Sequence, residues 1–513
     1  MKDRIVQVEQ GLLRGMFGSD PRVKVFRGVP YAKPPVGDLR WHSPVEAEPW
    51  EGIRNCYEYG QISIQSVPGG DPNEFWTREL HPCGPEFKMG EDCLYLNIYT
   101  PAKTGEEKLP VFCYIHGGGY QGGYAFEQEF DWEHLAARGV VVVGITYRLG
   151  LFGFLAHPEL SAEAPDAPKG NYGVEDQCFA LKWVQKNIAA FGGDPEKVTI
   201  AGQSAGAGSV QTQLTTPFAE GLFRGAIIQS SLTAEFADLP GNKRTLADAE
   251  ATGEEFFRLA GIGSLEEARA MDAFALFEKT RLLGRGMRFS PVTDGIFLKE
   301  STFEALKNGR WHNVPIIAGY NAGEVRMFNR FGGALPKTLE EFNTYLERLG
   351  DCGPEFLKYA DPKSDAEVAA IFEKDDYAHL IAATLIGGRI YDAQGRKAWL
   401  YNFEHEMPGD EDTSAFHGAE LWFAYDSLNR SWRPFTGKDE DLARAVSSYW
   451  INFIKTGDPN GCDKHGFPLP KWPAYSDAAP KIMHFTDAPR AEALDLSPIL
   501  AFRMDFTLEQ AIK

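Results

Sequence analysis

A serine stands between glycines directly after a short apolar segment in residues 198–208, VTIAGQSAGAG. The β-favouring residues at the start predict a buried strand, and Gly202 to Gly206 then fit the G-x-S-x-G pattern of a nucleophile elbow. A serine at the tip of a sharp strand-to-helix turn takes strained backbone angles, and the approaching helix leaves no space for side chains two positions before and after it. The pattern therefore predicts a strand–turn–helix unit that presents the Ser204 hydroxyl. A glycine-rich turn with an incidental serine is the alternative.

Several other segments predict the sheet to which this strand belongs. Residues 109–115, 140–147, 225–229, 314–319 and 398–403 are β-favouring runs, and residues 180–188 have helical apolar spacing. Strands that alternate with helices predict an α/β fold with a large, mostly parallel central sheet flanked by helices. A charged helical stretch at residues 243–283 is expected to be an insertion that forms a cap. We find no repeat or linker, so we expect a single domain over residues 1–513.

Two segments rich in proline and glycine are expected to be loops. In residues 25–41, proline or glycine interrupts every stretch that could otherwise form a helix. This segment is therefore expected to be an ordered loop. Residues 67–90 add Phe75, Trp76 and Phe87 and are a candidate lid or pocket wall. Packing of this aromatic loop onto the core is the alternative.

Composition and charge exclude several classes of partner. The chain has 43% hydrophobic and 24% charged residues, which is enough apolar material for a large folded core. Its formal net charge of -20 would repel a phosphate backbone, so no nucleic-acid partner is expected. There is no secretory signal and no apolar run near the ~20 residues that a membrane span needs, which predicts a soluble protein.

The cysteines indicate a reducing environment. They are seven in number and include no C-x-x-C pair. Sparse thiols in a chain without a signal indicate a cytoplasmic protein without structural disulfides. A bridge between Cys83 and Cys93 stays open as an alternative.

Three glycines, Gly117 to Gly119, follow the expected strand at residues 109–115. Together with Gly122 they fit G-x-G-x-x-G, the dinucleotide-binding pattern. That pattern requires an acidic residue at the end of the next strand, but residues 140–147 end in Thr-Tyr and are followed by Arg148. The better explanation is a loop whose backbone N–H groups stabilise an oxyanion.

An acid and a histidine follow Ser204 in the order that this kind of serine site requires. Residues 319–324, GYNAGE, place Glu324 in a loop after an expected strand, and residues 415–421, AFHGAEL, place His417 after the next one. Asp294 and Glu420 compete for the role of the acid, although loop and core contacts explain them equally well.

At this point the chain resembles the type-B carboxylesterases, the family of bacterial carboxylesterases, para-nitrobenzyl esterases, cholinesterases and some fungal lipases. Residues 91–97 (EDCLYLN) and the elbow are similar to two family signatures. Further similar segments are FRGVPYA at 26–32, YRLGLFGF at 147–154, and NF at 452–453 with TGDPN at 456–460. The matches occur in the family order and span nearly the whole chain.

The resemblance implies an α/β-hydrolase fold and assigns roles to individual residues. Ser204 would be the nucleophile, His417 the general base and then acid, and Glu324 the carboxylate that holds the imidazole. The implied oxyanion hole consists of the N–H groups of Gly118, Gly119 and Ala205. Other implied roles are a support for the acid (Ser230), a positioning residue before the glycines (His116), and buried ion pairs (Arg148 with Asp176, Arg40 with Glu91). The implied reaction needs neither a metal nor an organic cofactor.

Departures from the family narrow the expected substrate. Ser63 stands where members carry the cysteine that pairs with Cys93. The residue before the nucleophile is the neutral Gln203, where cholinesterases have an acid. Counted back from Glu91, their cation-binding tryptophan falls on Cys83, seven residues from Trp76. Choline esters are therefore not expected to be preferred.

These observations predict a monomeric serine carboxylesterase that acts on small-molecule substrates, namely neutral esters with short-to-medium acyl or aryl groups. Residues 283–290 are expected to form the acyl wall. A lipase acting on longer-chain esters is the alternative. A non-catalytic cholinesterase-like binding protein is a more remote one, because such domains typically lose the nucleophile.

Overall fold

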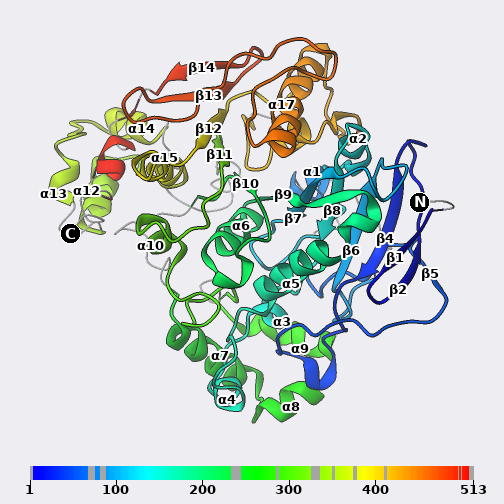
Figure 1. Cartoon of the computed structure of the whole chain (residues 1–513). Coiled ribbons are helices and arrows are strands. Elements are labelled where there is room, and N and C mark those ends of the chain that lie inside the picture. Colours follow the sequence, from blue (N-terminus) through cyan, green and yellow to red (C-terminus); the bar gives the residue numbers. More distant parts are fainter. Residues whose placement is uncertain are drawn as a thin grey trace.

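The computed structural model describes residues 4–66, 75–80, 88–232, 244–284, 288–324, 336–348, 353–373, 378–409 and 413–494, with 496–497, 500–505 and 507 near the C-terminus. A large twisted sheet runs through the middle of the molecule, and helices cover both of its faces (Figure 1).

The main sheet has eleven strands in the described part of the chain, in the order β14-β13-β12-β11-β10-β9-β7-β8-β6-β4-β3. Their bounds are β3 Met16–Phe17, β4 Lys24–Pro30, β6 Tyr95–Thr100, β7 Leu109–Ile115, β8 Val141–Ile145, β9 Gly193–Gln203, β10 Gly225–Gln229, β11 Ile316–Asn321, β12 Ala398–Phe403, β13 Lys481–Phe485 and β14 Arg490–Ala493. All pairs from β8 across to β13 are parallel, whereas the strands at both edges pair antiparallel. The mostly parallel α/β-hydrolase sheet expected from the sequence is confirmed.

Strand β7 shows how the sheet separates two hydrophobic cores. Val111, Cys113 and Ile115 contribute to one core, and the alternate residues Phe112 and Tyr114 contribute to the other. This follows from the alternation of side chains along a strand that is covered on both faces. The first core is closed by α5 Tyr172–Asn187, α6 Ala205–Thr215, α10 Thr302–Lys307 and α15 Ala378–Ala393, and the second by α2 Trp132–Ala137, α16 Glu420–Ala424 and α17 Gly437–Thr456.

Helical insertions extend beyond these two layers. The expected insertion at 243–283 consists of α7 Leu246–Ala260, α8 Leu265–Ala270 and α9 Ala273–Lys279. Arg40 fastens it to the body, because its Nη1 donates to Ala268 O at 2.8 Å and to Met271 O at 3.0 Å. The remaining described α-helices are α1 Phe75–Leu80, α3 Gly150–Phe154, α4 Pro158–Glu163, α12 Leu339–Arg348, α13 Gly353–Phe356 and α14 Asp365–Glu373. No helix within these ranges is long and apolar enough to cross a membrane.

The N-terminal part corrects one expectation. Residues 25–41 were expected to be a loop, but β4 covers Lys24–Pro30 and pairs antiparallel with β6. The strand accommodates Gly28, with φ 63°, through a register shift between Phe26 and Val29. Near the chain start, β1 Ile5–Val8 pairs with β2 Gly11–Arg14 in a separate small sheet completed by β5 Ile53–Asn55.

Candidate active site

Ser204 lies at the sharp turn between β9 and α6. Its backbone has φ 55° and ψ -124°, a conformation that residues with a Cβ rarely adopt. A Cβ on Gly202 would clash with the backbone of Gly206 and lie 2.8 Å from Ile115 O, and a Cβ on Gly206 would lie 2.9 Å from His116 O. The steric reason for both glycines, expected from the sequence, is confirmed.

The loops after β11 and β12 bring Glu324 and His417 together. Gly323 N donates to Ala415 O at 2.9 Å, which joins the two loops next to the site. His417 Nδ1 lies 2.5 Å from Glu324 Oε2. Glu324 is buried, and its Oε1 accepts a 2.8 Å hydrogen bond from Asn321 N. The carboxylate is therefore held on one side by the backbone and on the other by the imidazole.

The charges around His417 favour its protonated form. Removal from water would by itself lower the pKa of His417, but the charge of Glu324, its hydrogen bond and the charge of Glu420 together raise it above the usual value. Burial, helped by the nearby Glu324, raises the pKa of Glu420 to about 7. Glu420 accepts two hydrogen bonds: Asn321 Nδ2 donates to its Oε2 at 2.5 Å, and Gln229 Nε2 donates to its Oε1 at 3.3 Å.

Glu420 and Asp294, the other candidates for the acid, occupy different settings. Glu420 is bonded to the two side-chain amides just described. Asp294 accepts hydrogen bonds from Lys169 N at 3.0 Å and Leu298 N at 2.9 Å, so it organises a loop. The carboxylate against His417 Nδ1 is that of Glu324.

Gln203 reaches the opposite nitrogen of the imidazole. Its Nε2 lies 3.1 Å from His417 Nε2. When His417 donates its Nδ1–H to Glu324, Nε2 carries the lone pair, and the Gln203 amide can donate to it. The neutral residue before the nucleophile therefore stabilises the neutral imidazole in this tautomer.

The glycine loop after β7 packs against the elbow. A Cβ on Gly117 would lie 2.6 Å from Gln203 O and 3.4 Å from Ser204 Cβ. Gly118 and Gly119 have φ of 100° and 63°, so both are left-handed. Ala205 is the first residue of α6. Of the three residues expected to form an oxyanion hole, Gly118 and Gly119 line the same cavity as Ser204, and Ala205 follows Ser204 directly.

His116 shapes this loop from beneath. Its ring stacks on Tyr147 with centroids 4.4 Å apart, and its Nδ1 lies 3.0 Å from Gly117 O. Burial lowers the pKa of His116 to about 4, so the ring is neutral near pH 7. This agrees with a positioning role.

A cavity of about 670 Å³ opens above Ser204 and His417. One wall contains Phe277, Leu283 and Phe289 from the segment that follows and includes α9, together with Thr280 and Arg288. The lining also includes Trp76, Glu127, Glu129 and Phe130. The expected acyl wall at 283–290 is thus partly present, and residues 285–287 lie outside the described residues.

Trp76 brings part of the segment 67–90, the candidate pocket wall, to the cavity. It lies on α1 and lines the cavity, whereas Cys83, which counting from Glu91 placed at the tryptophan position, is not described. The ring of Trp76 lies 6.2 Å from that of Phe416, the residue before His417. The expected loop at 67–90 therefore contains a helix, and the cavity has an aromatic face. Cys83 and Phe87 lie outside the described residues.

Glu127 and Glu129 are cavity residues that sequence reasoning missed. They stand at alternate positions in FEQEF, residues 126–130, shortly after the glycine loop. Two acids flanked by aromatic residues in an otherwise buried segment are the signal that could have identified them. Both are buried and line the cavity that contains Ser204.

Ser230 does not make the expected contact. It has a left-handed backbone, φ 57°, and its buried Oγ has no hydrogen-bond partner in the described part of the chain. Glu324 is supported instead by Asn321 N, because the turn after β11 aims that N–H at the carboxylate.

The expected ion pairs and the Cys93 environment are confirmed. Arg148 Nη2 lies 2.7 Å from Asp176 Oδ1, and Arg40 Nε lies 2.6 Å from Glu91 Oε1. Cys93 is a free buried thiol that is hydrogen-bonded to Ser63. Cys83, the other half of the bridge that the sequence left open, lies outside the described residues.

Known proteins similar to this chain are esterases. A sequence profile described as the carboxylesterase family matches residues 2–499. Fumonisin B1 esterase of Sphingopyxis macrogoltabida is 33% identical over 515 residues, covering 96% of this chain and 88% of that protein. Cocaine esterase of Homo sapiens is 32% identical, covering 91% and 84%.

Solved structures agree with these relatives. A PNB esterase matches with a TM-score of 0.78 at 28% identity, over 96% of this chain and 97% of that chain. A carboxylesterase of Geobacillus stearothermophilus matches with a TM-score of 0.76 at 31% identity, over 95% and 97%.

Proposed function

Since the chain belongs to the carboxylesterase family and is a carboxylic ester hydrolase, we propose that Ser204 is its nucleophile, His417 its base and Glu324 the orienting acid. The observation that carries this proposal is the 2.5 Å contact between His417 Nδ1 and Glu324 Oε2 beside the strained Ser204. This contact fixes the tautomer that leaves Nε2 free to take a proton.

The proposed reaction has two acyl-transfer steps. His417 Nε2 takes the Ser204 proton, the alkoxide attacks the ester carbonyl, and the N–H groups of Gly118, Gly119 and Ala205 stabilise the oxyanion. Each such donor contributes about 3 kcal/mol to lowering the barrier. His417 then protonates the leaving alcohol, and a water repeats the sequence to release the acid.

Gln203 has a supporting role in this proposal. The Gln203 amide is hydrogen-bonded to His417 Nε2 while no substrate is bound. This hydrogen bond must break when His417 Nε2 takes the Ser204 proton. For Ser230 we propose only a structural role, since its hydroxyl has no contact with Glu324.

We propose uncharged short-to-medium acyl or aryl groups as the acyl part of the substrate. The wall of Phe277, Leu283 and Phe289 is apolar, and a cavity of about 670 Å³ is the size that holds small ligands. A survey of kcat/KM over para-nitrophenyl esters of graded acyl length tests this. A maximum at long acyl chains with activation at an oil–water interface would favour a lipase instead.

We also propose that residues 1–513 act as one monomeric domain in the cytoplasm. The eleven strands of the main sheet come from segments between residues 16 and 493, which supports one domain. The five described cysteines are free thiols, as a reducing compartment favours. The net charge of -20 argues against a nucleic-acid partner.

A further inference from the structure

Two carboxylates that the proposed reaction does not use line the same cavity as Ser204. Glu127 is 7% exposed and Glu129 is 1% exposed, and their side chains are hydrogen-bonded to each other. Glu129 Oε2 is buried and accepts no hydrogen bond from the described residues. A buried acceptor without a donor is costly, by about 1–3 kcal/mol, unless something else donates to it. The cavity lining thus includes one carboxylate oxygen, Glu129 Oε2, that has no hydrogen-bond donor among the described residues.

The two acids share protons while the cavity is empty. Burial and the charge of Glu129 raise the pKa of Glu127 well above its usual value, and burial raises the pKa of Glu129 to about 8. Two carboxylates in contact cannot both be ionised in a buried site. A bound cation would displace protons from the pair and allow the two groups to ionise.

Neighbouring segments hold these acids in place. Ser427 Oγ donates to Glu129 O at 2.7 Å, Arg430 Nη1 donates to Phe130 O at 2.8 Å, and Gln128 Nε2 donates to Arg430 O at 2.5 Å.

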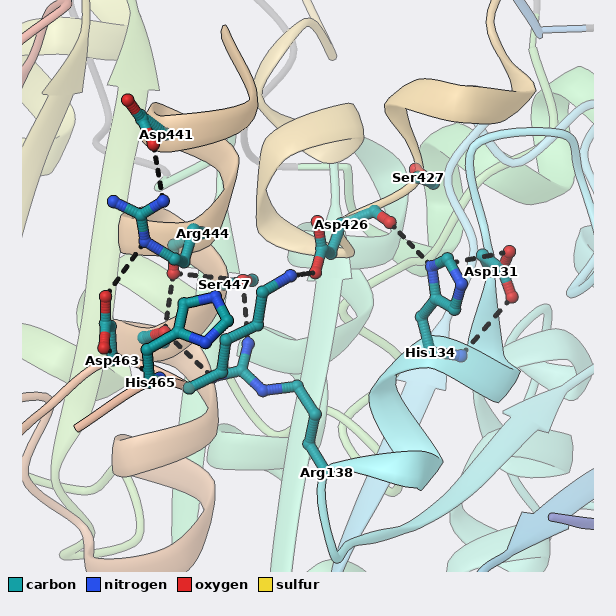
Figure 2. A network of polar contacts seen from close by, with 12 residues as sticks. Asp131, His134, Arg138, Asp426, Ser427, Asp441, Arg444, Ser447, Asp463 and His465 are labelled. Atoms are coloured by element: carbon teal, nitrogen blue, oxygen red, sulfur yellow. Dashed lines mark hydrogen bonds and ion pairs between the residues drawn. The ribbon is translucent and has the colours of Figure 1, made fainter. Parts of the chain in front are cut away.

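The polar network of Figure 2 fixes the segment that carries Ser427. His134 Nδ1 lies 3.0 Å from Asp426 O, and Lys464 Nζ lies 2.9 Å from Asp426 Oδ2. On the same face Arg138 donates to Ser447 at 2.8 Å and so ties α2 to α17. The carboxylates are therefore preorganised by contacts outside the cavity.

The position of the two acids indicates which part of the ester they meet. Trp76, on their side of the cavity, contacts Phe416, and Phe416 precedes His417. The charge of Glu79, which lies on the same helix as Trp76, also raises the pKa of Glu129. His417 is the group that protonates the leaving alcohol, so this side of the cavity receives the alcohol part. The apolar wall around Phe289 receives the acyl part.

We propose that Glu127 and Glu129 bind a protonated primary amine on the alcohol part of the ester substrate. The inference rests on the proposed function and deepens it. A primary ammonium has three N–H donors, so it can satisfy Glu129 Oε2 and Glu127 together while its stem lies against Trp76. A quaternary ammonium has no N–H group, so this mode of binding differs from that of choline.

The test compares four butyrate esters of para-substituted phenols with the full-length enzyme. The substituents are aminomethyl, ethyl, hydroxymethyl and trimethylammoniomethyl, and each kcat/KM is divided by the rate of hydroxide hydrolysis to remove differences in leaving-group reactivity. We expect the aminomethyl ester to exceed the ethyl ester by about tenfold or more, and the other two esters to fall short of it. An aminomethyl-to-ethyl ratio near one, or an equal advantage of the trimethylammonium ester, would overturn the proposal.

Variants locate the effect within the cavity. Glu129→Gln and Glu127→Gln should each lower the aminomethyl-to-ethyl ratio by about tenfold, because each removes one charged acceptor. Glu266→Gln, which removes an exposed carboxylate on α8, should leave the ratio unchanged. An unchanged ratio in both cavity variants would contradict the inference. If the melting curve shows that a variant does not fold, the aminomethyl-to-ethyl ratio of the wild-type enzyme alone decides whether the proposal stands.

Failure of the proposed function would look different. Ser204→Ala would then hydrolyse the ethyl ester at the wild-type rate, whatever the ratio between substrates. Equal hydrolysis of the aminomethyl and ethyl esters that depends on Ser204 would instead retain the function and reject only the amine site.

Discussion

Ser204 is held in its strained conformation by hydrogen bonds on both sides. Its N–H donates to Gln229 O at 2.9 Å, and its carbonyl accepts from Gly208 N at 3.0 Å. A left-handed backbone at a residue with a Cβ costs about 1–3 kcal/mol and persists only where the surroundings enforce it. The strand β10 and the helix α6 supply that enforcement, so the hydroxyl is positioned before any substrate arrives.

The first prediction concerns this hydroxyl. Ser204→Ala should lower kcat by up to ~10⁶, because no other group replaces the nucleophile. Hydrolysis of para-nitrophenyl butyrate by the purified variant measures the loss, with Ser19→Ala, an exposed serine, as the control that keeps wild-type activity. A folded Ser204→Ala protein with roughly a tenth of the wild-type activity would reject the assignment.

The second prediction concerns the protonation of His417. Its pKa is raised above 6.5, and a protonated imidazole cannot accept the Ser204 proton. The value of kcat/KM should therefore fall as the pH drops through that raised pKa, at a higher pH than for an ordinary histidine. A profile that is flat between about pH 5 and about pH 8 would argue against a histidine base.

Glu420→Gln provides a control for the cause of the shift. The charge of Glu420 raises the pKa of His417, so its removal should move the fall in kcat/KM to lower pH. An unchanged profile in a folded Glu420→Gln protein would show that Glu324 alone sets the pKa.

Among the elements, those with local signals could be predicted from the sequence. The strand before Ser204, the helix after it and the glycine loop each carry their own periodicity or turn residues, and so do the loops with Glu324 and His417. The order Ser204, Glu324, His417 then identified the candidate site. These signals are local because the required backbone geometry is local.

Elements that depend on distant partners could not be predicted in the same way. Strand β4 contains Gly28 and ends at Pro30, and its pairing with β3 and β6 makes it a strand. Trp76 reaches the cavity because α1 is anchored by contacts some 350 positions away in the chain. Glu127 and Glu129 form a pair only once burial removes water from both. None of these relationships has a short sequence pattern.

The third prediction tests the anchor of α1. Glu79 and Arg433 form a fully buried ion pair at 2.6 Å, and Trp432 Nε1 donates to the same carboxylate at 2.9 Å. Glu79→Ala should lower the free energy of unfolding by about 3–5 kcal/mol, because it leaves the Arg433 charge buried without its carboxylate. Urea unfolding followed by tryptophan fluorescence measures the change.

An exposed pair of the same kind is the matched control. Glu255 and Arg258 lie on α7 at 2.6 Å, with side chains 33% and 67% exposed. Glu255→Ala should leave the free energy of unfolding nearly unchanged, because water and salt screen an exposed pair. If Glu79→Ala has an equally small effect, the buried pair does not anchor α1.

At the scale of the whole molecule, the two cores on either side of the main sheet stabilise the fold, and the five cysteines within the described ranges are free thiols. Cys113 lies in the first core and is a free thiol, as are Cys56, Cys93 and Cys178. Burial raises the pKa of Cys56 and of Cys178 to about 12, so these thiols stay protonated and react slowly near neutral pH.

The last prediction follows from these free thiols. A reducing agent should leave the melting temperature unchanged, whereas loss of a structural disulfide would cost about 2–5 kcal/mol and lower it by a few degrees in a chain of this length. Calorimetric scans with and without the reducing agent measure this. Titration of the denatured, unreduced chain with a thiol reagent should find all seven cysteines of the sequence reactive. Fewer reactive thiols, together with a lower melting temperature on reduction, would reveal a disulfide and count against a protein that is stabilised by packing alone.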